Sequence, residues 1–560
     1  MPKIIIIGSG VAGLASALRF SVRGYEVDVF ESNNYVGGKI AEVKGSGYRF
    51  DAGPSLFTMP ELIDDLIRLS DNNPQNYFQY SRLKESCRYF FDDKTIINGY
   101  SDIDRFVFEA SKKTGVDPKK LKSFFKKNKF IYNSTKSIFI EKSLHKLSTY
   151  LSFKTFLSFL KIPFLNIFTT MNKVNENSLK NKKLTQLFNR FATYNGSNPY
   201  KAPGILNIIS HLEFNQGAFF PKRGMRSIVD VLYKICLERN VKFHLNSKVD
   251  KINLKNNKAI GVEVNGKSYN SDLVISNVDI HFVYKNLLDV KKKPIRILKQ
   301  ERSSSALIFY WGISKLFKSL DLHNILFSSD YKNEFNQIFN EKTVPDDPTV
   351  YINITSKYKA DDAPKGHENW FVMINVPHNQ NQDWKSLISI ARKNIIHKIN
   401  NHFKVDLEKL IVFEEYLDPI RIENKTGSYL GSLYGNSSNS KSSAFFRHAN
   451  FSSKIKDLYF CGGSVHPGGG IPLALNSAKI IDEIVKLMKL LKKNIIVSLL
   501  LIFHLIGMLG LSFQSSQDVF LFLTPYHLFF TFILIFISKN YTKKFFQLTA
   551  LIFLLGFFIE

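Results

Sequence analysis

The chain has few cysteines and no recognisable hydrolase or metal-binding pattern. Only Cys87, Cys236 and Cys461 occur among its 560 residues, and none belongs to a CxxC motif. This spacing argues against a disulfide framework and indicates a reducing compartment. The N-terminus, MPKIIIIGSG, has too short an apolar run for a secretory signal peptide. Because neither an HExxH motif nor a Ser-His-Asp arrangement is readable, we predict no metal site and find no support for hydrolase chemistry.

Acidic residues are also scarce relative to basic ones. The 76 Lys and Arg residues outnumber the 48 Asp and Glu residues, which gives a formal net charge of +28. Such an excess is typical of a surface that meets nucleic acid or anionic lipid. In Phe153–Phe168 the cations Lys154 and Lys161 are interleaved with Phe and Leu, as in helices at a membrane surface, although a core helix fits equally well. We therefore expect membrane lipid as a partner and no nucleic acid.

The start of the chain predicts a strand, a helix and a second strand. Ile4–Ile7 is a continuous β-branched run, Val11–Arg23 has helical spacing, and Val27–Phe30 returns to strand character. The turn between the first strand and the helix has the GxGxxG pattern, Gly8-Ser9-Gly10-Val11-Ala12-Gly13. This βαβ unit is typical of dinucleotide-binding folds.

Each position of this turn has a physical role in the dinucleotide-binding prediction. Gly8 permits the tight turn, Gly10 lets a pyrophosphate approach the backbone, and Gly13 packs the helix against the strand. Val11 and Ala12 open the helix, whose N-terminus attracts phosphate. Glu31, at the end of the second strand, is expected to accept hydrogen bonds from ribose hydroxyls.

A long interval without strand character separates this unit from the next strands. Pro60–Thr193 is helical, basic and aromatic, and we expect no strand-rich stretch within it. In chain order, the elements expected afterwards are strands at Val241–Leu245, Ala259–Val264 and Leu273–Ser276, a hairpin turn at Asn265-Gly266, an α+β segment over Ala306–Leu417, a Gly-rich element at Cys461–Gly470 and a helix from about Ala474 to Leu491.

The composition changes to apolar near the C-terminus. Residues 494–512 and 519–538 are apolar runs close to the ~20 residues that span a bilayer as helix, and residues 545–559 form a shorter third run. Lysines flank the start of the first run and the end of the second, while the loop at residues 514–518 has none. The positive-inside rule then places the large domain on the cytoplasmic face of a membrane. A buried helical hairpin in a soluble protein is the alternative.

Two further segments favour FAD over NAD. Gly37-Gly38-Lys39 adds a glycine pair and a cation beside the expected pyrophosphate, and Phe50-Asp51-Ala52-Gly53-Pro54 follows. Together they resemble the flavoprotein superfamily of amine oxidases, protoporphyrinogen oxidase and phytoene desaturases. In that signature the basic residue is more often Arg, so Lys39 keeps the charge but loses the planar fork. The resemblance implies that Gly38 and Lys39 contact FAD.

The C-terminal glycine element carries a more specific resemblance. Its run from Tyr459 to Leu473 contains Cys461-Gly462-Gly463 and HPGGGIP, which resembles the second flavin motif of the phytoene desaturase-like carotenoid oxidoreductases. The form of this motif, with Arg447-His448 upstream, is most similar to the 1-hydroxycarotenoid 3,4-desaturases. Many relatives have Asp at the position of Gly463, so backbone N–H groups would have to replace that contact. The resemblance implies FAD contacts at Val249, Gly462, Gly463, Gly470, Ile471 and Pro472, although an ordinary strand is equally consistent with Val249.

His466 is the most attractive titratable residue for catalysis beside the expected flavin, whereas Asp51 is better explained as a carboxylate that holds its loop. A histidine titrates near neutral pH and can move a proton, but in this motif it can equally hold the loop by hydrogen bonds. We treat catalysis by His466 as a hypothesis and loop stabilisation as its alternative.

The resemblance implies FAD-dependent desaturation of a membrane-dissolved carotenoid, by hydride transfer to the flavin. A 1-hydroxycarotenoid is the expected substrate, with a phytoene or ζ-carotene desaturase as the alternative. A noncatalytic GDI-like carrier of prenyl lipids is the alternative from another class, and other enzymes of carotenoid synthesis are possible partners. Residues 522–525 and 548–560 also resemble the start of the membrane carotenoid hydratases.

These inferences define an α/β fold class with three parts. A Rossmann-like FAD-binding domain is expected to be discontinuous, from residues 1–60, 200–280 and 425–490. An inserted α+β domain for the substrate and membrane takes residues 61–199 and 281–424, and residues 494–560 form two or three transmembrane helices.

Overall fold

The computed structural model describes residues 1–150, 158 and 161–486. The apolar runs at residues 494–512, 519–538 and 545–559 lie outside these residues, as does most of Phe153–Phe168. Within the described part, no helix is both long enough and apolar enough to cross a bilayer. The transmembrane prediction therefore stays a prediction.

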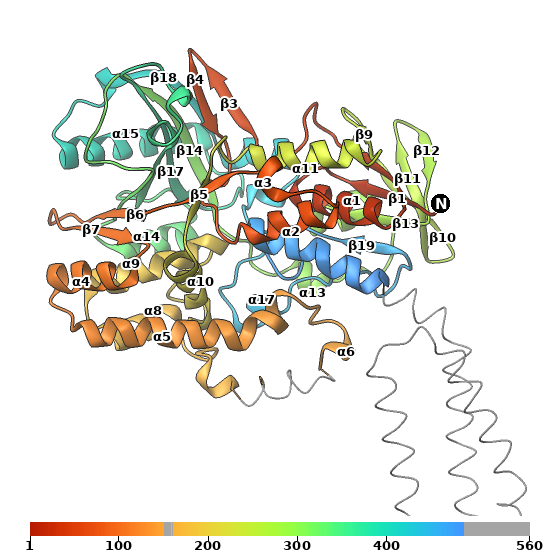
Figure 1. The fold of residues 1–560 in the computed structure, drawn as a ribbon, viewed down its shortest axis with the longest axis horizontal. Helices are drawn as coiled ribbons and strands as arrows, with labels where there is room; N and C mark the ends of the chain where they lie inside the picture. Colours follow the sequence, from red (N-terminus) through yellow and green to blue (C-terminus); the bar gives the residue numbers. More distant parts are fainter. Residues whose placement is uncertain (151–157, 159–160, 487–560) are drawn as a thin grey trace, which may run out of the picture. The chain divides into compact units, whose positions relative to one another are not determined.

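A five-stranded parallel sheet holds the N-terminal strands. Its order is β19 (Leu458–Phe460), β13 (Leu273–Ser276), β1 (Lys3–Ile7), β2 (Glu26–Phe30) and β9 (Lys242–His244). The isoleucines of β1 are buried along the whole run, as expected of a parallel strand covered on both faces. Helix α1 (Val11–Val22) connects β1 to β2 and packs against α11 (Ser227–Glu238), next to α2 (Glu61–Leu69) (Figure 1). The predicted βαβ unit is confirmed.

The predicted hairpin is also confirmed. Strands β10 (Lys251–Lys255), β11 (Lys258–Val264) and β12 (Lys267–Asn270) form a small antiparallel sheet. Asn265 and Gly266 both have positive φ, 50° and 73°, as the type I′ turn between β11 and β12 requires.

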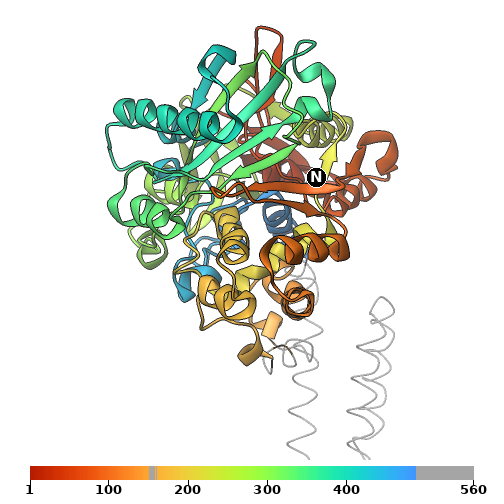
Figure 2. The ribbon, with the colours of Figure 1, turned by 90° about the vertical axis from the view of Figure 1, so that its left-hand side faces the viewer.

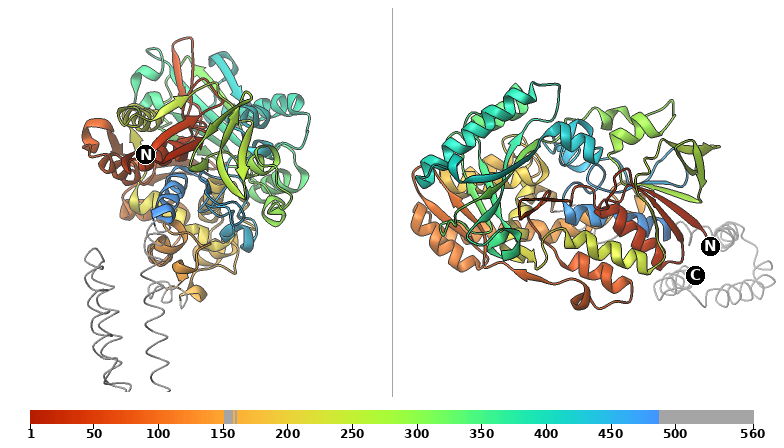
Figure 3. Two further views of the ribbon diagram at one scale, coloured as in Figure 1. Left: turned by 90° about the vertical axis from the view of Figure 1, so that its right-hand side faces the viewer. Right: turned by 90° about the horizontal axis from the view of Figure 1, so that it is seen from above.

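The second large sheet has seven strands. Its order is β18 (Ile411–Leu417), β14 (Ser305–Ile313), β17 (Glu368–Val376), β16 (Val350–Ile354), β15 (His323–Leu326), β6 (Glu85–Phe90) and β7 (Ile96–Tyr100). The two large sheets lie at opposite ends of the described part (Figure 3). The predicted α+β segment over residues 306–417 is thus confirmed.

The prediction of a strand-free interval from Pro60 to Thr193 is wrong. This interval contains β6 and β7, and a third strand, β5 (Tyr80–Arg82), pairs with β8 (Phe219–Pro221). Strand β6 is joined to the large sheet by parallel pairing with β15, which lies far along the chain. A local pattern could not show this pairing, because the charged residues Glu85 and Arg88 interrupt the apolar run of β6. The two side chains form an ion pair with an N–O distance of 2.9 Å.

The two faces of the seven-stranded sheet have different neighbours. Alternate residues of β14 point to opposite faces: Leu307, Phe309 and Trp311 belong to the core under α15 (Trp384–Phe403), whereas Ile308 and Tyr310 belong to a separate cluster. Figure 2 shows α15 on one side of this sheet and the helices of residues 103–189 below it. Those are α4 (Ile103–Thr114), α5 (Pro118–Thr135), α8 (Met171–Leu179) and α9 (Lys182–Asn189), packed around a cluster of phenylalanines.

Candidate active site

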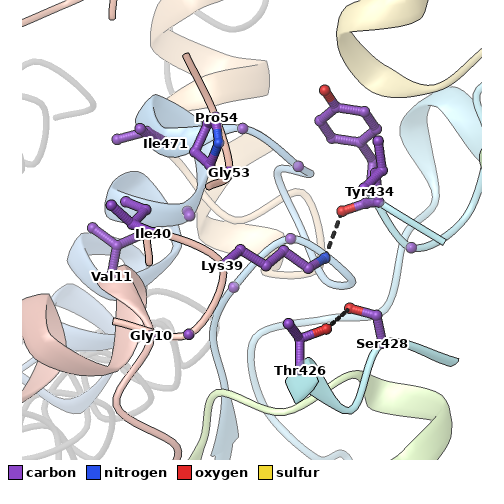
Figure 4. A pocket seen from close by; sticks show the side chains of 18 of the residues that line it. Gly10, Val11, Lys39, Ile40, Gly53, Pro54, Thr426, Ser428, Tyr434 and Ile471 are labelled. Atoms are coloured by element: carbon purple, nitrogen blue, oxygen red, sulfur yellow. Dashed lines mark hydrogen bonds between the residues drawn. The ribbon is translucent and has the colours of Figure 1, made fainter. Parts of the chain in front are cut away.

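A cavity of about 1790 Å³ is lined by residues of both large sheets and by the three glycine-rich segments. It reaches Ile7 and Phe30, the last residues of β1 and β2, so it opens at the carboxyl ends of the parallel strands, where such folds bind ligands. Figure 4 shows Gly10, Val11 and Lys39 on one side of it and Tyr434 on the other. The predicted site residues that line it are Gly8, Gly10, Val11, Ala12, Glu31, Gly38, Lys39, Val249, Gly462, Gly463, His466, Gly470, Ile471 and Pro472.

The first glycine turn has the geometry that the GxGxxG pattern predicts. Gly8 has φ +91°, which only glycine adopts readily, and Gly10 is the N-cap of α1 without a side-chain capping bond. Val11 and Ala12, the first two residues of the helix, line the cavity, so their backbone N–H groups are suited to an anion. Gly13 does not line the cavity; a Cβ there would lie 2.2 Å from the carbonyl oxygen of Gly8, so its role is close packing.

Glu31 is buried and follows β2 directly, as predicted. Its Oε2 accepts from the backbone N–H of Ser9 at 2.9 Å and from the Ser9 hydroxyl at 2.7 Å, while Oε1 accepts from the backbone N–H of Asn33 at 2.9 Å. The carboxylate thus fixes the glycine turn to the end of β2. Its contact with a ribose stays a prediction.

Lys39 extends a cation toward the centre of the cavity. Its Nζ donates to the carbonyl oxygen of Leu433 at 2.7 Å (Figure 4). Burial lowers the pKa of Lys39 to about 8, while Asp279 favours the charged form and Arg302 opposes it. A phosphate in the cavity would therefore stabilise the ammonium form.

The C-terminal glycine element meets the first turn at Asn277, which follows β13. In the amide orientation that satisfies its neighbours, Oδ1 of Asn277 accepts from the N–H groups of Gly10 and Gly13, at 3.1 and 3.3 Å. A Cβ on Gly462 would lie 2.7 Å from the other end of the same amide group. Sequence analysis missed Asn277; its only signal was its position at the carboxyl end of a predicted parallel strand.

The helix after this element begins earlier than predicted. Residues 471–486 are helical, so the helix starts at Ile471 instead of Ala474, because Pro472 fits the first turn of a helix, where its missing N–H is not needed. Ile471 and Pro472 line the cavity at this N-terminus. Gly463 also lines it, and a Cβ there would lie 3.2 Å from the Cα of Gly469.

The positions of Val249 and His466 bear on the two interpretations that the sequence left open for each residue. Val249 lies in the loop between β9 and β10 and lines the cavity, so it is not an ordinary strand residue. The His466 ring donates from Nε2 to the carbonyl oxygen of Lys142 at 2.8 Å, and burial lowers its pKa to about 4. These contacts favour the loop-holding role, while catalysis by His466 stays a hypothesis.

Arg447 is a buried cation whose place in the site the sequence did not predict. Its guanidinium donates to the carbonyl oxygens of Tyr434 at 2.9 Å and Gly463 at 3.3 Å, and burial lowers its pKa to about 10. A buried cation held by carbonyl dipoles beside the second glycine motif favours negative charge in the cavity. Its only sequence signal was its position upstream of the glycine motif.

The site therefore fits a large anionic dinucleotide. One end offers a helix N-terminus and Lys39 to a pyrophosphate, and the other offers glycine backbone and Arg447 to a ring that becomes negatively charged. The parallel sheet with its glycine turn, beside a second sheet across a cavity, is typical of the class of flavin-dependent oxidoreductases.

Comparisons with known proteins identify the family. The flavin containing amine oxidoreductase family matches residues 11–480. A 1-hydroxycarotenoid 3,4-desaturase of Flavobacterium sp. is 50% identical over 485 residues, which are 87% of this chain and 99% of that protein. A 4,4'-diaponeurosporene oxygenase of Staphylococcus haemolyticus is 31% identical over 487 residues, which are 86% of this chain and 97% of that protein.

Solved structures support the fold alone. A redesigned putrescine oxidase is 13% identical, covers 87% of this chain and 99% of its own, and superposes with a TM-score of 0.58. The chain belongs to the flavin-containing amine oxidoreductase family and, within it, to the carotenoid oxidoreductases represented by the two relatives. Its cofactor is FAD.

Proposed function

We propose that this chain is an FAD-dependent desaturase that introduces the 3,4 double bond into a 1-hydroxycarotenoid. The observation that carries the proposal is the 50% identity to such a desaturase over nearly that protein's whole length. When bound, FAD supplies the two-electron acceptor that oxidation of a carbon–carbon single bond requires.

The residues of the cavity suit a long apolar substrate beside the cofactor. Ile308, Phe371 and Met373 line it from the seven-stranded sheet. Phe139, Ile140, Ile205, Ile209 and Leu212 line it from the helical part. Such walls exclude water and hold a polyene chain in one orientation, which is the main task left to the protein when the cofactor carries the chemistry.

The test is expression in cells that supply either a 1-hydroxycarotenoid or phytoene, followed by chromatography of the products. We expect a product with one additional double bond from the hydroxylated substrate. Conversion of phytoene alone would replace the proposal with the phytoene desaturase alternative. A purified protein without flavin absorbance would favour a noncatalytic carrier.

Membrane lipid is part of the proposal, because a carotenoid is dissolved there. Next to the undescribed part of Phe153–Phe168, the side chains of Phe164 and Phe168 are 64% and 69% exposed. Lys161 lies nearby, with its Nζ 5.7 Å from the ring centre of Phe130, which is 42% exposed. Aromatic rings interleaved with cations are suited to an anionic lipid surface.

The apolar runs at residues 494–512, 519–538 and 545–559 would add a stable membrane anchor and place the enzyme on the cytoplasmic face of the membrane. Liposome co-sedimentation of the chain cut after residue 490 measures lipid binding by the aromatic surface without the C-terminal anchor. We expect the shortened chain to bind anionic vesicles weakly and to lose this binding when Phe164 and Phe168 are replaced by Ser. Equal binding of the shortened chain and this variant would reject the aromatic surface as a lipid contact.

A further inference from the structure

A hydrogen-bonded group of polar side chains lies among apolar residues on the wall that the seven-stranded sheet gives to the cavity. Tyr351 of β16 lies between Ile325 of β15 and Met373 of β17, and all three side chains line the cavity. The Tyr351 hydroxyl lies 2.7 Å from Oγ of Ser55 and 2.7 Å from Nδ1 of His323. The three side chains form a continuous hydrogen-bonded line.

The neighbours of His323 fix the direction of these hydrogen bonds. Nδ2 of Asn353 donates to the carbonyl oxygen of Leu322 at 2.9 Å and lies 3.1 Å from Nδ1 of His323. Because an amide nitrogen only donates, Nδ1 of His323 is an acceptor, and the Tyr351 hydroxyl donates to it. The oxygen of Tyr351 then accepts from the Ser55 hydroxyl, which leaves lone pairs of Ser55 available to the cavity.

Burial keeps the hydrogen-bonded side chains of Ser55, Tyr351 and His323 uncharged. His323 is 3% exposed, and burial lowers its pKa to about 3, so it is uncharged at neutral pH. Its Nε2 has no hydrogen-bond partner among the described residues. Retention of buried polar groups, one of them unsatisfied, in the wall of an apolar site costs stability and indicates a role in binding.

Ser55 places this hydrogen-bonded group beside the cofactor segments. It follows Gly53 and Pro54, and a Cβ on Gly53 would lie 1.9 Å from the carbonyl oxygen of Lys39, so this loop packs directly on the segment that carries Lys39. Gly53, Pro54 and Ile471 all line the cavity (Figure 4). The hydroxyl of a 1-hydroxycarotenoid is separated by only a few bonds from the carbon–carbon bond to be oxidised, so its binding group must also lie close to the cofactor.

A second polar cluster of the cavity is less suited to this role. Arg190 and Tyr194 line the cavity, but both bond to the carboxylate of Glu213, at 3.2 and 2.6 Å. The Tyr194 hydroxyl and the terminal guanidinium nitrogens of Arg190 therefore bond within the protein, and Nε of Arg190 is the atom of this cluster's hydrogen-bonding groups that lacks a partner among the described residues. A guanidinium nitrogen can donate to a substrate oxygen but cannot accept from a hydroxyl group.

We propose that Ser55 and Tyr351 bind the hydroxyl group of the substrate and thereby select hydroxylated over non-hydroxylated carotenoids. The substrate hydroxyl donates to the Ser55 oxygen, and the line through Tyr351 ends at His323, which is a positioning residue. This inference rests on the proposed function, because it presumes a substrate with a hydroxyl group near the bond to be oxidised.

The test compares kcat/KM for a 1-hydroxycarotenoid and for the same carotenoid without the hydroxyl, in the full-length holoenzyme. We expect Ser55→Ala and Tyr351→Phe to lower kcat/KM for the hydroxylated substrate by about tenfold, with the value for the other substrate changed less than about twofold. His323→Leu should reduce the ratio of the two values, and His323→Gln, which keeps an acceptor, should restore part of it. Tyr200→Phe removes a hydroxyl outside the cavity lining and is the matched control.

The outcomes separate this inference from the proposed function. Equal losses on both substrates in Ser55→Ala and Tyr351→Phe, with unchanged flavin absorbance, would overturn the inference while the function stands. A selective loss in Tyr194→Phe instead would move hydroxyl binding to the Arg190 cluster and also overturn it. A wild-type enzyme that shows no preference for the hydroxylated carotenoid would overturn the proposed function itself.

Discussion

Gly10 and Gly13 lie in one turn but have different neighbours. A Cβ on Gly10 would meet the side-chain amide of Asn277 at 2.6 Å, and Gly10 lines the cavity. A Cβ on Gly13 would meet a backbone oxygen, that of Gly8, which cannot move without the strand. Gly10 therefore lines the candidate cofactor site, whereas Gly13 serves the packing of α1 on β1.

We expect Gly13→Ala to lower the free energy of unfolding by about 1–3 kcal/mol, as overpacking in a closed site does. Gly10→Ala should reduce stability less, because the side chain of Asn277 can rotate away from the new methyl group. It should lower the FAD content, because the methyl group enters the expected phosphate site. Thermal unfolding of the flavin-free proteins and the ratio of flavin to protein absorbance measure the two effects. Identical profiles for both variants would contradict the assignment.

His466 should act through the loop. His466→Ala removes the bond to Lys142 and the ring contact with His145, so we expect a loss of about 1 kcal/mol in stability. We also expect turnover and FAD content close to wild type. A large fall in kcat with intact flavin, with a changed pH profile, would instead support the catalytic hypothesis.

At the scale of elements, a buried ion pair joins the helical part to the seven-stranded sheet. Arg190 of η3 (Arg190–Asn195) pairs with Glu213 of η5 (Leu212–Gln216) at 3.2 Å, and it also donates to the hydroxyl of Tyr89 in β6 at 2.9 Å. Both charges are almost fully buried. Replacement of one partner leaves an uncompensated buried charge. The resulting loss of stability is far larger than the net stabilisation that the intact ion pair provides.

Arg190→Met should therefore lower the free energy of unfolding by about 3–5 kcal/mol. The double variant with Glu213→Leu should recover part of this loss, because no buried charge remains. Lys409→Met is the matched control, since its ion pair with Asp406 is exposed and its removal should cost at most about 1 kcal/mol. Urea unfolding followed by circular dichroism gives these values, and a double variant less stable than Arg190→Met would contradict the explanation.

The helices and strands also show which elements local sequence patterns can predict. The strand of Ile4–Ile7, the helix at Val11 and the hairpin at Asn265-Gly266 were predicted because periodicity and turn chemistry determine them within a few residues. Strands β6 and β7 were missed, because β6 is stabilised by β15, a partner remote in sequence, and its charged residues hide the pattern.

For the molecule as a whole, buried histidines predict sensitivity to acid. Burial lowers the pKa of His378, His448 and His466 to about 4, and that of His323 to about 3. Between these values and the unfolded pKa of about 6.5, the unfolded chain binds more protons, so stability rises with pH in this window.

We expect the unfolding midpoint to fall as the pH is lowered from about 6.5 to about 4, with each histidine contributing up to about 1.4 kcal/mol per pH unit. Glu334, whose pKa burial raises to about 7, opposes this trend. Burial also raises the pKa of Asp51, Glu85 and Asp92, which act in the same direction as Glu334. Urea unfolding at several pH values measures the slope, and His378→Gln should reduce it. A midpoint independent of pH in this range would contradict the prediction.

The sequence by itself indicated the cofactor class and most of the glycine-rich segments that line the cavity. Glycines at Gly8, Gly10 and Gly462 and the cation at Lys39 carry that information locally, because a backbone turn with its helix start needs only neighbouring residues to form. The tertiary structure alone brought Asn277, Arg447 and the line from Ser55 through Tyr351 to His323 to one cavity. These residues belong to strands and loops that meet only by long-range pairing, so no spacing in the sequence could show their proximity.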